Sequence, residues 1–532
     1  AKGEHGNSVD TTTVVVFPPH RQEGPAKLIQ NTRTFVAEGD LYTDEFIAKN
    51  FPEIPPKLIT EGLAKDRFTP PPPAYQHPRI FFNHSDLAAM RERLRTTKAG
   101  RSAMAQVRTW YEMRTRDNGG IPTDYFLPKK NSNGETVHTY DFLAAQMFCN
   151  GAFIAMIDGN TTLARKLIDG AMRCADSQLA RIAATPPDKR GFQGYGNGVL
   201  GRYATAYIYD FLYPWMTPDE RAKLRGIISE VTREVYSIGM FSVPGGHGAS
   251  NWVCWITGDL LTCVTAIEGE DGFDPVVYKE AAKAMNNFYT FGIKPDGSSF
   301  EGMGKNSITG EELMILAKRG EMAVAYENIY NHVANFYLHV MQPFGESFIS
   351  DDLWGTSRHP LTPSDAAVVK WAYPDDPVID FVYRNIVGEK YRISRLDSSY
   401  VYTNGLVNCW VAQDWQGGSD WDTHAKTALA KQPTSHLFNY TNIATARSAW
   451  QQDAAFLYFV PRLHGGHRAP ARGAFVFSAL GRDWSIYPSG HNQKSSLQHS
   501  VITVDDTSYM AESFGRIIAF DDNDQRMIAA CD

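Results

Sequence analysis

The densest group of residues that could do chemistry is the segment Pro244-Gly245-Gly246-His247-Gly248-Ala249-Ser250-Asn251-Trp252, which opens an apolar stretch with a helical pattern. Glycines before a helix N-terminus leave backbone N–H groups free to face an anion. His247 and Asn251 add side chains that can donate hydrogen bonds to a carboxylate. Read alone, the segment is more simply a glycine-rich loop with a capping Asn.

Two further segments share this polar, glycine-rich character. One runs from Pro295 to Asn306 between predicted helices, and by itself it is typical of a solvated turn. The other is His464-Gly465-Gly466-His467-Arg468, which precedes a strand-like stretch, with His491 and His499 downstream. Three or four histidines around one sheet could bind a metal, but their spacings match no standard zinc pattern.

The elements that must position these residues are predicted to be helical from residue 77 to 394. Apolar residues recur every three or four positions in residues 140–157, 161–183, 217–240 and 253–267. Thr217 begins one helix, since it is followed by proline and two acids, and Ser85 and Asp86 can cap another through Leu87. About ten or more helices without a fixed repeat favour a bundle or toroid over a solenoid.

Beyond residue 395 the period becomes two, which predicts an antiparallel sheet. The candidate strands are rich in Val, Phe, Tyr and Trp and lie in residues 399–413, 454–463, 473–480, 483–488, 499–506, 516–520 and 526–530. Residues 1–76 are polar and end in prolines, which predicts an extended arm. We therefore expect an arm (1–76), a helical domain (77–394) and a β domain (395–532), and the β domain looks short.

Composition excludes several classes of protein. The chain has 532 residues with 52 Lys+Arg against 59 Asp+Glu, a net charge of −7, which argues against a general nucleic-acid binder. Its 43% hydrophobic and 12% aromatic residues exclude a largely disordered chain. No run of about 18 apolar residues predicts a membrane span. Six scattered cysteines without a CxxC pair predict neither a disulfide framework nor a cysteine metal site.

The order of these segments resembles the heparinase II/III-like polysaccharide lyases and the related dermatan sulfate epimerases, over about residues 77–510. The motifs that carry the resemblance are His77-Pro78-Arg79-Ile80, His247-x-x-x-Asn251-x-Val253, Asp296-Gly297-Ser298 leading to Glu301-Gly302, and Gly466-His467 with Gly473, Phe475, Gly481-Arg482 and His499-Ser500-Val501. The resemblance implies an (α/α) toroid followed by an antiparallel β-sandwich, with the active site in the cleft between them.

The resemblance also implies a β-elimination on uronic acids in acidic polysaccharides. A proton leaves C5, alpha to the carboxylate, and the C4 oxygen departs to give an unsaturated sugar. Hydrogen-bond donors aimed at the carboxylate stabilise the enolate-like intermediate, as in an oxyanion hole. By resemblance, His247 and Asn251 would neutralise the carboxylate, and His467 would be the base or the acid.

One residue departs from the family pattern at the centre of the chemistry. Lys305 stands where the family has its catalytic tyrosine. A lysine becomes a base only if its pKa falls from about 10.4 by roughly 3 units, as a desolvated site can achieve. Otherwise Lys305 would serve as carboxylate neutraliser or as the acid for the leaving group. The base would then be His467 or a tyrosine such as Tyr195.

The family's metal positions depart as well. They hold Ala469 and, approximately, Tyr487, and only His499 of the expected ligands remains, so we predict no metal and no other cofactor. Rings stack on sugars and arginine forks pair with acidic groups, which adds candidates for substrate binding. These candidates are Tyr195, Arg202, Trp252, Glu301, Arg468 and Arg472.

We therefore expect an extracellular or periplasmic polysaccharide lyase whose partner is an anionic polysaccharide, with neither nucleic acid nor membrane involved. Three alternatives stay open. A uronate C5 epimerase shares the proton abstraction. A glycoside hydrolase needs two carboxylates about 5–9 Å apart, of which Glu301 is one candidate. A non-catalytic carbohydrate-binding protein would keep its affinity after loss of Lys305 or His467.

Overall fold

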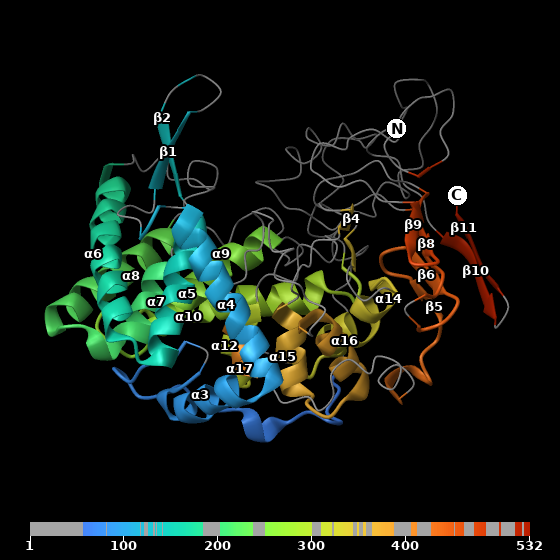
Figure 1. Cartoon of the computed structure of the whole chain (residues 1–532), viewed down its shortest axis with the longest axis horizontal. Helices are drawn as coiled ribbons and strands as arrows, with labels where there is room; N and C mark the ends of the chain where they lie inside the picture. The colour runs from blue at the N-terminus through green and yellow to red at the C-terminus, as the bar shows by residue number, and fades with distance from the viewer. Residues whose placement is uncertain are drawn as a thin grey trace.

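The structure is a computed structural model in which a helix-rich region is followed by an antiparallel sheet (Figure 1). This confirms the coarse fold class predicted from the change of period. The structure describes residues 57–80, 82–117, 119–121, 126–130, 134, 136–140, 142–184, 203–237, 251–299, 310–321, 324–343, 348–350, 355–357, 364–387, 406–411, 427–451, 453–461, 473–485, 500–501, 517–523 and 526–531.

Fourteen α-helices lie in this part of the chain, together with two π-helical segments, η6 (Phe288–Gly292) and η7 (His332–Tyr337). The α-helices are α3 (Leu87–Thr96), α4 (Lys98–Asp117), α5 (Phe142–Asp158), α6 (Thr161–Ala184), α7 (Tyr203–Leu212), α8 (Pro218–Ser237), α9 (Asn251–Ala266), α10 (Pro275–Asn287), α12 (Gly310–Lys318), α13 (Glu327–Asn331), α14 (Leu338–Val340), α15 (Ser364–Ala372), α16 (Pro377–Val387) and α17 (Leu406–Val411).

Helix starts follow local side-chain chemistry. Thr217 and Glu220 form the predicted start of α8: Glu220 N–H donates to Thr217 Oγ1 (3.3 Å) and Thr217 N–H to Glu220 Oε2 (2.9 Å). The cap before α3 differs from the prediction. Asn83 N–H donates to Asp86 Oδ2 (2.7 Å), which closes the short turn ahead of the helix. Asp86 therefore caps one turn early, and Ser85 takes no part in the hydrogen bond.

Within the described residues, the main sheet has five antiparallel strands in chain order, and three two-stranded sheets accompany it. Its strands are β5 (Ser435–Phe438), β6 (Ile443–Arg447), β7 (Phe456–Val460), β8 (Ala474–Ala479) and β9 (Arg482–Ser485). The pairs are β1 (Phe126–Lys130) with β2 (Thr136–Tyr140), β3 (Phe348–Ser350) with β4 (Gly355–Ser357), and β10 (Ile517–Asn523) with β11 (Arg526–Cys531). The first two pairs interrupt the region predicted to be helical. Asn133-Gly134 lies between β1 and β2, and such a dipeptide is a hairpin signal that helical periodicity overshadowed.

One face of the five-stranded sheet packs on the end of the helical stretch formed by α13, η7 and α14. The Arg447 guanidinium donates to the carbonyl oxygens of Leu338, His339 and Met341, at 3.4, 3.2 and 2.7 Å. Gln342 donates to Ser478 Oγ (3.1 Å). A continuous apolar core joins the helices to this face of the sheet, so the sheet has a fixed place against the helices.

One predicted strand is a helix. Residues 406–411, inside the stretch 399–413, form α17, which packs on α12 and α15. Leu406, Val407, Cys409 and Val411 are all buried. The Glu311 carboxylate accepts hydrogen bonds from the first backbone N–H groups of this helix. An apolar run that is buried all round lacks the alternation of a half-buried strand, and periodicity alone cannot separate it from a buried helix.

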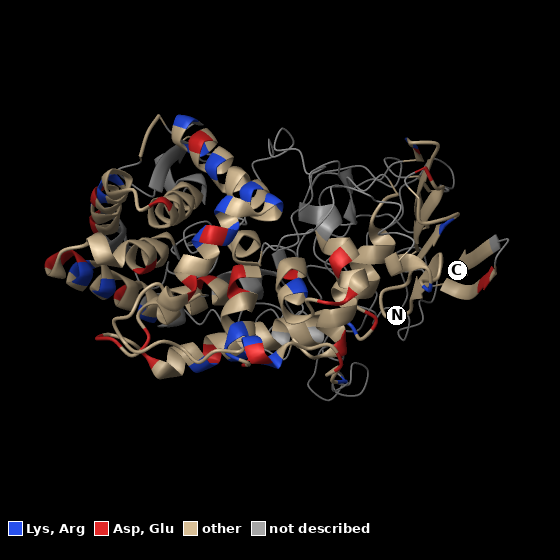
Figure 2. Ribbon diagram, turned by 60° about the horizontal axis from the view of Figure 1, so that its bottom comes forward, with Lys and Arg blue, Asp and Glu red and all other residues tan. Residues whose placement is uncertain are grey.

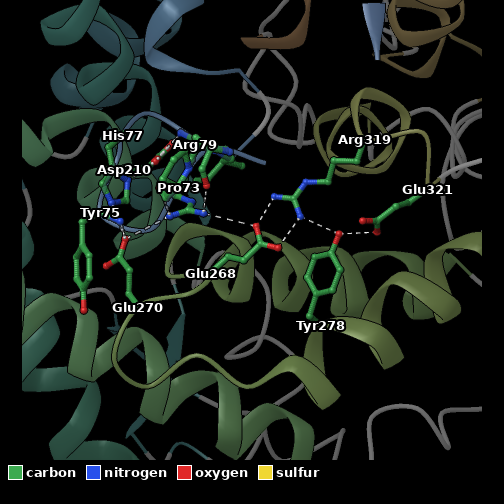
Figure 3. Close-up of polar contacts among 12 residues, drawn as sticks. Pro73, Tyr75, His77, Arg79, Asp210, Glu268, Glu270, Tyr278, Arg319 and Glu321 are labelled. Atoms are coloured by element: carbon green, nitrogen blue, oxygen red, sulfur yellow. Dashed lines mark hydrogen bonds and ion pairs between the residues drawn. The ribbon is translucent and has the colours of Figure 1, made fainter. Parts of the chain in front are cut away.

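Residues 57–80 run along the helices and are held by a buried network of charged side chains (Figure 3). His77 Nδ1 lies 2.7 Å from Asp210 Oδ1, and its Nε2 lies 2.9 Å from Glu270 Oε1. The network continues through Arg79, Glu268 and Arg319 to Tyr278 and Glu321. His77, Asp210 and Glu270 are buried, so this network anchors the segment and offers nothing to a substrate.

Candidate functional site

Two of the site residues predicted from the sequence lie in the described part of the chain, at the start of α9. Asn251 and Trp252 form the first turn of this helix, and their backbone is described. The other candidates lie outside the described residues: Tyr195, Arg202, His247, Glu301, Lys305, His467, Arg468 and Arg472. The same holds for the family's metal positions Ala469, Tyr487 and His499. The site is therefore built from the elements that flank these residues.

The segment that carries Glu301 and Lys305 is flanked by two elements that both pack on α9. The π-helical segment η6 comes before it, and α12 follows it directly. Gly258 of α9 marks the contact with α12, because a Cβ there would lie 2.7 Å from Glu312 Cγ. Gly258 follows Asn251 by seven residues, about 10 Å along the same helix face. Both ends of the segment are thus tied to the helix that begins at Asn251.

The turn at the start of this segment is tightly built. Asp296 Oδ1 accepts hydrogen bonds from Ser298 N–H (3.0 Å) and Ser298 Oγ–H (2.6 Å), and Lys294 N–H donates to the Ser298 carbonyl (2.9 Å). Gly297 has φ +84°, a left-handed backbone conformation that glycine adopts readily because it has no Cβ. Ser298 and Ser299 are buried. The Asp296-Gly297-Ser298 motif therefore forms a fixed turn, although it reads as a solvated one in the sequence.

A row of side chains on α13 and η7 holds this turn by its carbonyl groups. Asn331 Nδ2 donates to Pro295 O (2.7 Å), and His332 Nδ1 donates to Gly297 O (2.5 Å). Asn335 Nδ2 donates to Asp296 O (2.9 Å). Asn328 Nδ2 holds the stem, through the carbonyls of Thr290 and Ile293 at 2.7 and 2.8 Å.

Two ionisable groups of the turn have shifted pKa values. Burial lowers the pKa of Lys294 to about 8, with the Asp296 carboxylate opposing the change. Burial raises the pKa of Asp296, against hydrogen bonds from Ser298 and from Tyr440 N–H. A lysine with a pKa near 8 is about one-tenth neutral at pH 7 and more so at higher pH, so Lys294 is a candidate proton acceptor. Lys294 was not among the residues predicted from the sequence, where its place beside Asp296-Gly297 is the single signal that points to it.

Two buried carboxyl groups lie where the segment ends, in the first turn of α12. Burial raises the pKa of Glu311 to about 7, with backbone hydrogen bonds opposing the change. Burial also raises the pKa of Glu312 well above its ordinary value, and Glu311 and Asp259 add to the rise. A carboxyl group with a raised pKa can act as an acid. These groups, too, were missed, since two adjacent acids at a helix start are a common dipole-favoured feature.

Three further features of the described part of the chain bear on its function: the distribution of charge, the groups that could bind a metal and the apolar character of the helices. Lys and Arg are interspersed with Asp and Glu along the helices seen in Figure 2. Within the described residues, no group of three His, Cys, Asp or Glu side chains is arranged to hold a metal ion. None of the described helices combines the length and the apolar character that a membrane span requires.

Comparisons with known proteins give a structural likeness. No protein-family model matches the sequence, and no curated protein matches it significantly. Among solved structures, the chain is similar to heparan sulfate lyase HepC from Pedobacter heparinus, with a TM-score of 0.48 and 12% identity over 84% of this chain and 69% of that one. It is also similar to a heparinase III, with a TM-score of 0.49 and 12% identity over 81% and 66% of the two chains. Likenesses of this size determine neither family nor activity.

Proposed function

We propose that the chain is a polysaccharide lyase that cleaves a uronic-acid-containing acidic polysaccharide by β-elimination. The proposal includes an (α/α) toroid followed by a β-sandwich, an extracellular or periplasmic location, and no metal. Its first support is the order of four sequence motifs. Its second is geometric: the segment with Glu301 and Lys305 is tied at both ends to α9, the helix that begins at Asn251.

The proposed roles follow from what the reaction needs. His247 and Asn251 donate hydrogen bonds to the uronate carboxylate, so that negative charge can develop on it when C5 loses its proton. Lys305 removes the proton if its site lowers its pKa, and otherwise protonates the C4 oxygen as it leaves. His467 takes the complementary role. Tyr195, Arg202, Trp252, Glu301, Arg468 and Arg472 bind the sugar chain.

The test is the ultraviolet absorbance of the unsaturated uronate during incubation with alginate, glycosaminoglycans, glucuronan, pectin and ulvan. We expect a rise on one polymer, and we expect Lys305→Ala to abolish it. Lys283→Ala is the matched control, because Lys283 is an exposed lysine on α10. New reducing ends without absorbance would replace the proposal by a hydrolase. Exchange of the C5 proton with solvent, without cleavage, would replace it by an epimerase.

A further inference from the structure

We propose that Asn331, His332 and Asn335 are positioning residues for this reaction. They fix the turn Pro295–Gly297, from which the segment with Glu301 and Lys305 continues, and Asn335 also ties that turn to the five-stranded sheet. This inference rests on the proposed function and adds to it a set of residues that need not touch the substrate.

The spacing of the donors suits one helix face. Asn328, Asn331, His332 and Asn335 stand at positions i, i+3, i+4 and i+7, which face the same side of a helix. Their acceptors are the carbonyls of Thr290 and Ile293 in the stem and the three consecutive carbonyls of Pro295–Gly297 in the turn. The helix therefore grips the turn along its length and not at a single point. π-helical turns such as η7 occur frequently at functional sites.

The turn needs these donors because its own backbone N–H groups reach the carbonyls of Lys294 and Ser298, at 2.8 and 2.9 Å, and leave those of Pro295, Asp296 and Gly297 to side chains. In the described part of this turn, Ile293 and Ser299 form a single β-bridge, and the residues between them lie outside any ladder. Buried backbone carbonyls nearly always have a hydrogen-bond partner. Here side chains supply it for Pro295, Asp296 and Gly297. Without the donors the turn would have to move toward water.

His332 is itself held in one orientation. Its Nδ1–H donates to Gly297 O, and its Nε2 lies 3.6 Å from Asp365 Oδ2. Tyr337 Oη–H donates to the same carboxylate at 2.8 Å. Burial lowers the pKa of His332 to about 4, so the ring is neutral and its Nδ1 carries the hydrogen. The ring therefore offers the turn a fixed donor.

Asn335 joins three parts of the structure. An amide group has two hydrogens, and Nδ2 lies 2.9 Å from Asp296 O and 3.1 Å from Nε2 of His436 on β5. Tyr440 N–H, in the link between β5 and β6, is 3.4 Å from Asp296 Oδ2. The turn is thus held from the helices and from the sheet at the same residue. Loss of Asn335 should remove the donor to Asp296 O together with its link to His436, while the contacts from Asn331, His332 and Tyr440 remain.

The experiment compares Asn335→Leu with wild type and with Asn286→Leu. Leucine keeps the size of the side chain and removes both donor hydrogens. Asn286 is the matched control, because its Nδ2 donates to a backbone carbonyl, that of Glu321, away from the turn. The readouts are kcat and KM on the polymer that wild type cleaves, and amide hydrogen exchange of residues 293–299 in the full chain.

We expect Asn335→Leu to lower kcat by about tenfold or more while KM changes less, since a misplaced catalytic group mainly affects the chemical step. We also expect faster exchange in residues 293–299, and neither change in Asn286→Leu. If the leucine variant does not fold, Asn335→Ser, which is too short to reach both acceptors, is measured in the same way. Unchanged exchange, or faster exchange with unchanged kcat, refutes the positioning role. A wild-type chain that is inactive on every polymer refutes the proposed function instead, and exchange alone then decides whether Asn335 holds the turn.

Discussion

Replacement of Gly297 by alanine should destabilise the protein and displace the turn that precedes the proposed catalytic segment. Gly297 has φ +84°, and a Cβ there would lie 2.2 Å from the Asn331 carbonyl oxygen and 2.6 Å from His332 N. These are backbone atoms of a helix, which cannot rotate away. Real Cβ atoms stay at least 3.0 Å from other heavy atoms, so the turn must move by about 3.0 − 2.2 = 0.8 Å.

The size of this movement sets the expected loss. If the shift falls along the hydrogen bonds, the 2.5 Å bond from His332 to Gly297 O lengthens to about 3.3 Å, and the 2.9 Å bond from Asn335 to Asp296 O to about 3.7 Å. The second is then broken. Left-handed backbone costs an alanine roughly 1–2 kcal/mol, and overpacking costs roughly 1–3 kcal/mol. The free energy of unfolding should therefore fall by about 2–5 kcal/mol.

Two control glycines separate these contributions in urea denaturation. Gly159 has φ +65° and no atom within 4 Å of a Cβ, so Gly159→Ala should show the backbone cost alone. Gly226 lies inside α8 with φ negative and equally open space, so Gly226→Ala should be neutral or stabilise by about 0.5–1 kcal/mol. The excess loss in Gly297→Ala over Gly159→Ala measures the clash. Equal losses in these two variants, with turnover of Gly297→Ala unchanged, would refute the reasoning.

Two further predictions concern buried histidines. Burial alone would lower the pKa of His77, but its hydrogen bonds and charge attraction to Asp210 and Glu270 outweigh burial and raise the pKa. The stabilisation of the folded state by protonated His77 is therefore present below pH 6.5 and is lost as pH rises through the raised pKa. His77→Gln should lower the free energy of unfolding by roughly 3–5 kcal/mol below pH 6.5 and remove this pH dependence, which urea denaturation across the range would detect. Burial lowers the pKa of His436 to about 4, against Asp522, so its stabilisation is present above pH 6.5 and is lost as pH falls toward 4, by roughly 3 kcal/mol. The free energy of unfolding of His436→Gln should therefore fall less than that of wild type as pH is lowered. The same pH dependence in wild type and variant would contradict the assignment.

The sequence predicted those parts of the fold that local rules determine. Long amphipathic segments became α6 and α8, and the period-two segments 454–463 and 473–480 became β7 and β8. α17 was predicted wrongly, because a short run with four buried apolar residues looks alike in a strand and in a helix. Its state depends on Glu311, almost 100 residues earlier, whose carboxylate accepts its first N–H groups. No local pattern contains that contact.

The candidate site likewise depends on contacts between residues that are far apart in the sequence. Its motifs were visible as glycine-rich loops, but the residues that hold the turn were not. In the sequence, Asn328, Asn331, His332 and Asn335 form the polar face of a short helix, and such a face ordinarily points to water. Their partners lie about 40 residues earlier in the chain, so only the tertiary fold reveals what they bind.

The choice of donors at this turn has a consequence for catalysis. Lysine or arginine could also hold buried carbonyls, but their positive charge would have to be taken out of water. Asparagine carries no charge, and burial keeps His332 and His436 neutral down to a pH of about 4. These side-chain donors therefore do not titrate near neutral pH, whereas burial raises the pKa of Asp365, beside His332, to about 7 and lowers the pKa of Lys294, in the turn, to about 8. In a pH profile of the proposed reaction, a lysine base at Lys305 would appear as activity that rises with pH until the lysine is neutral.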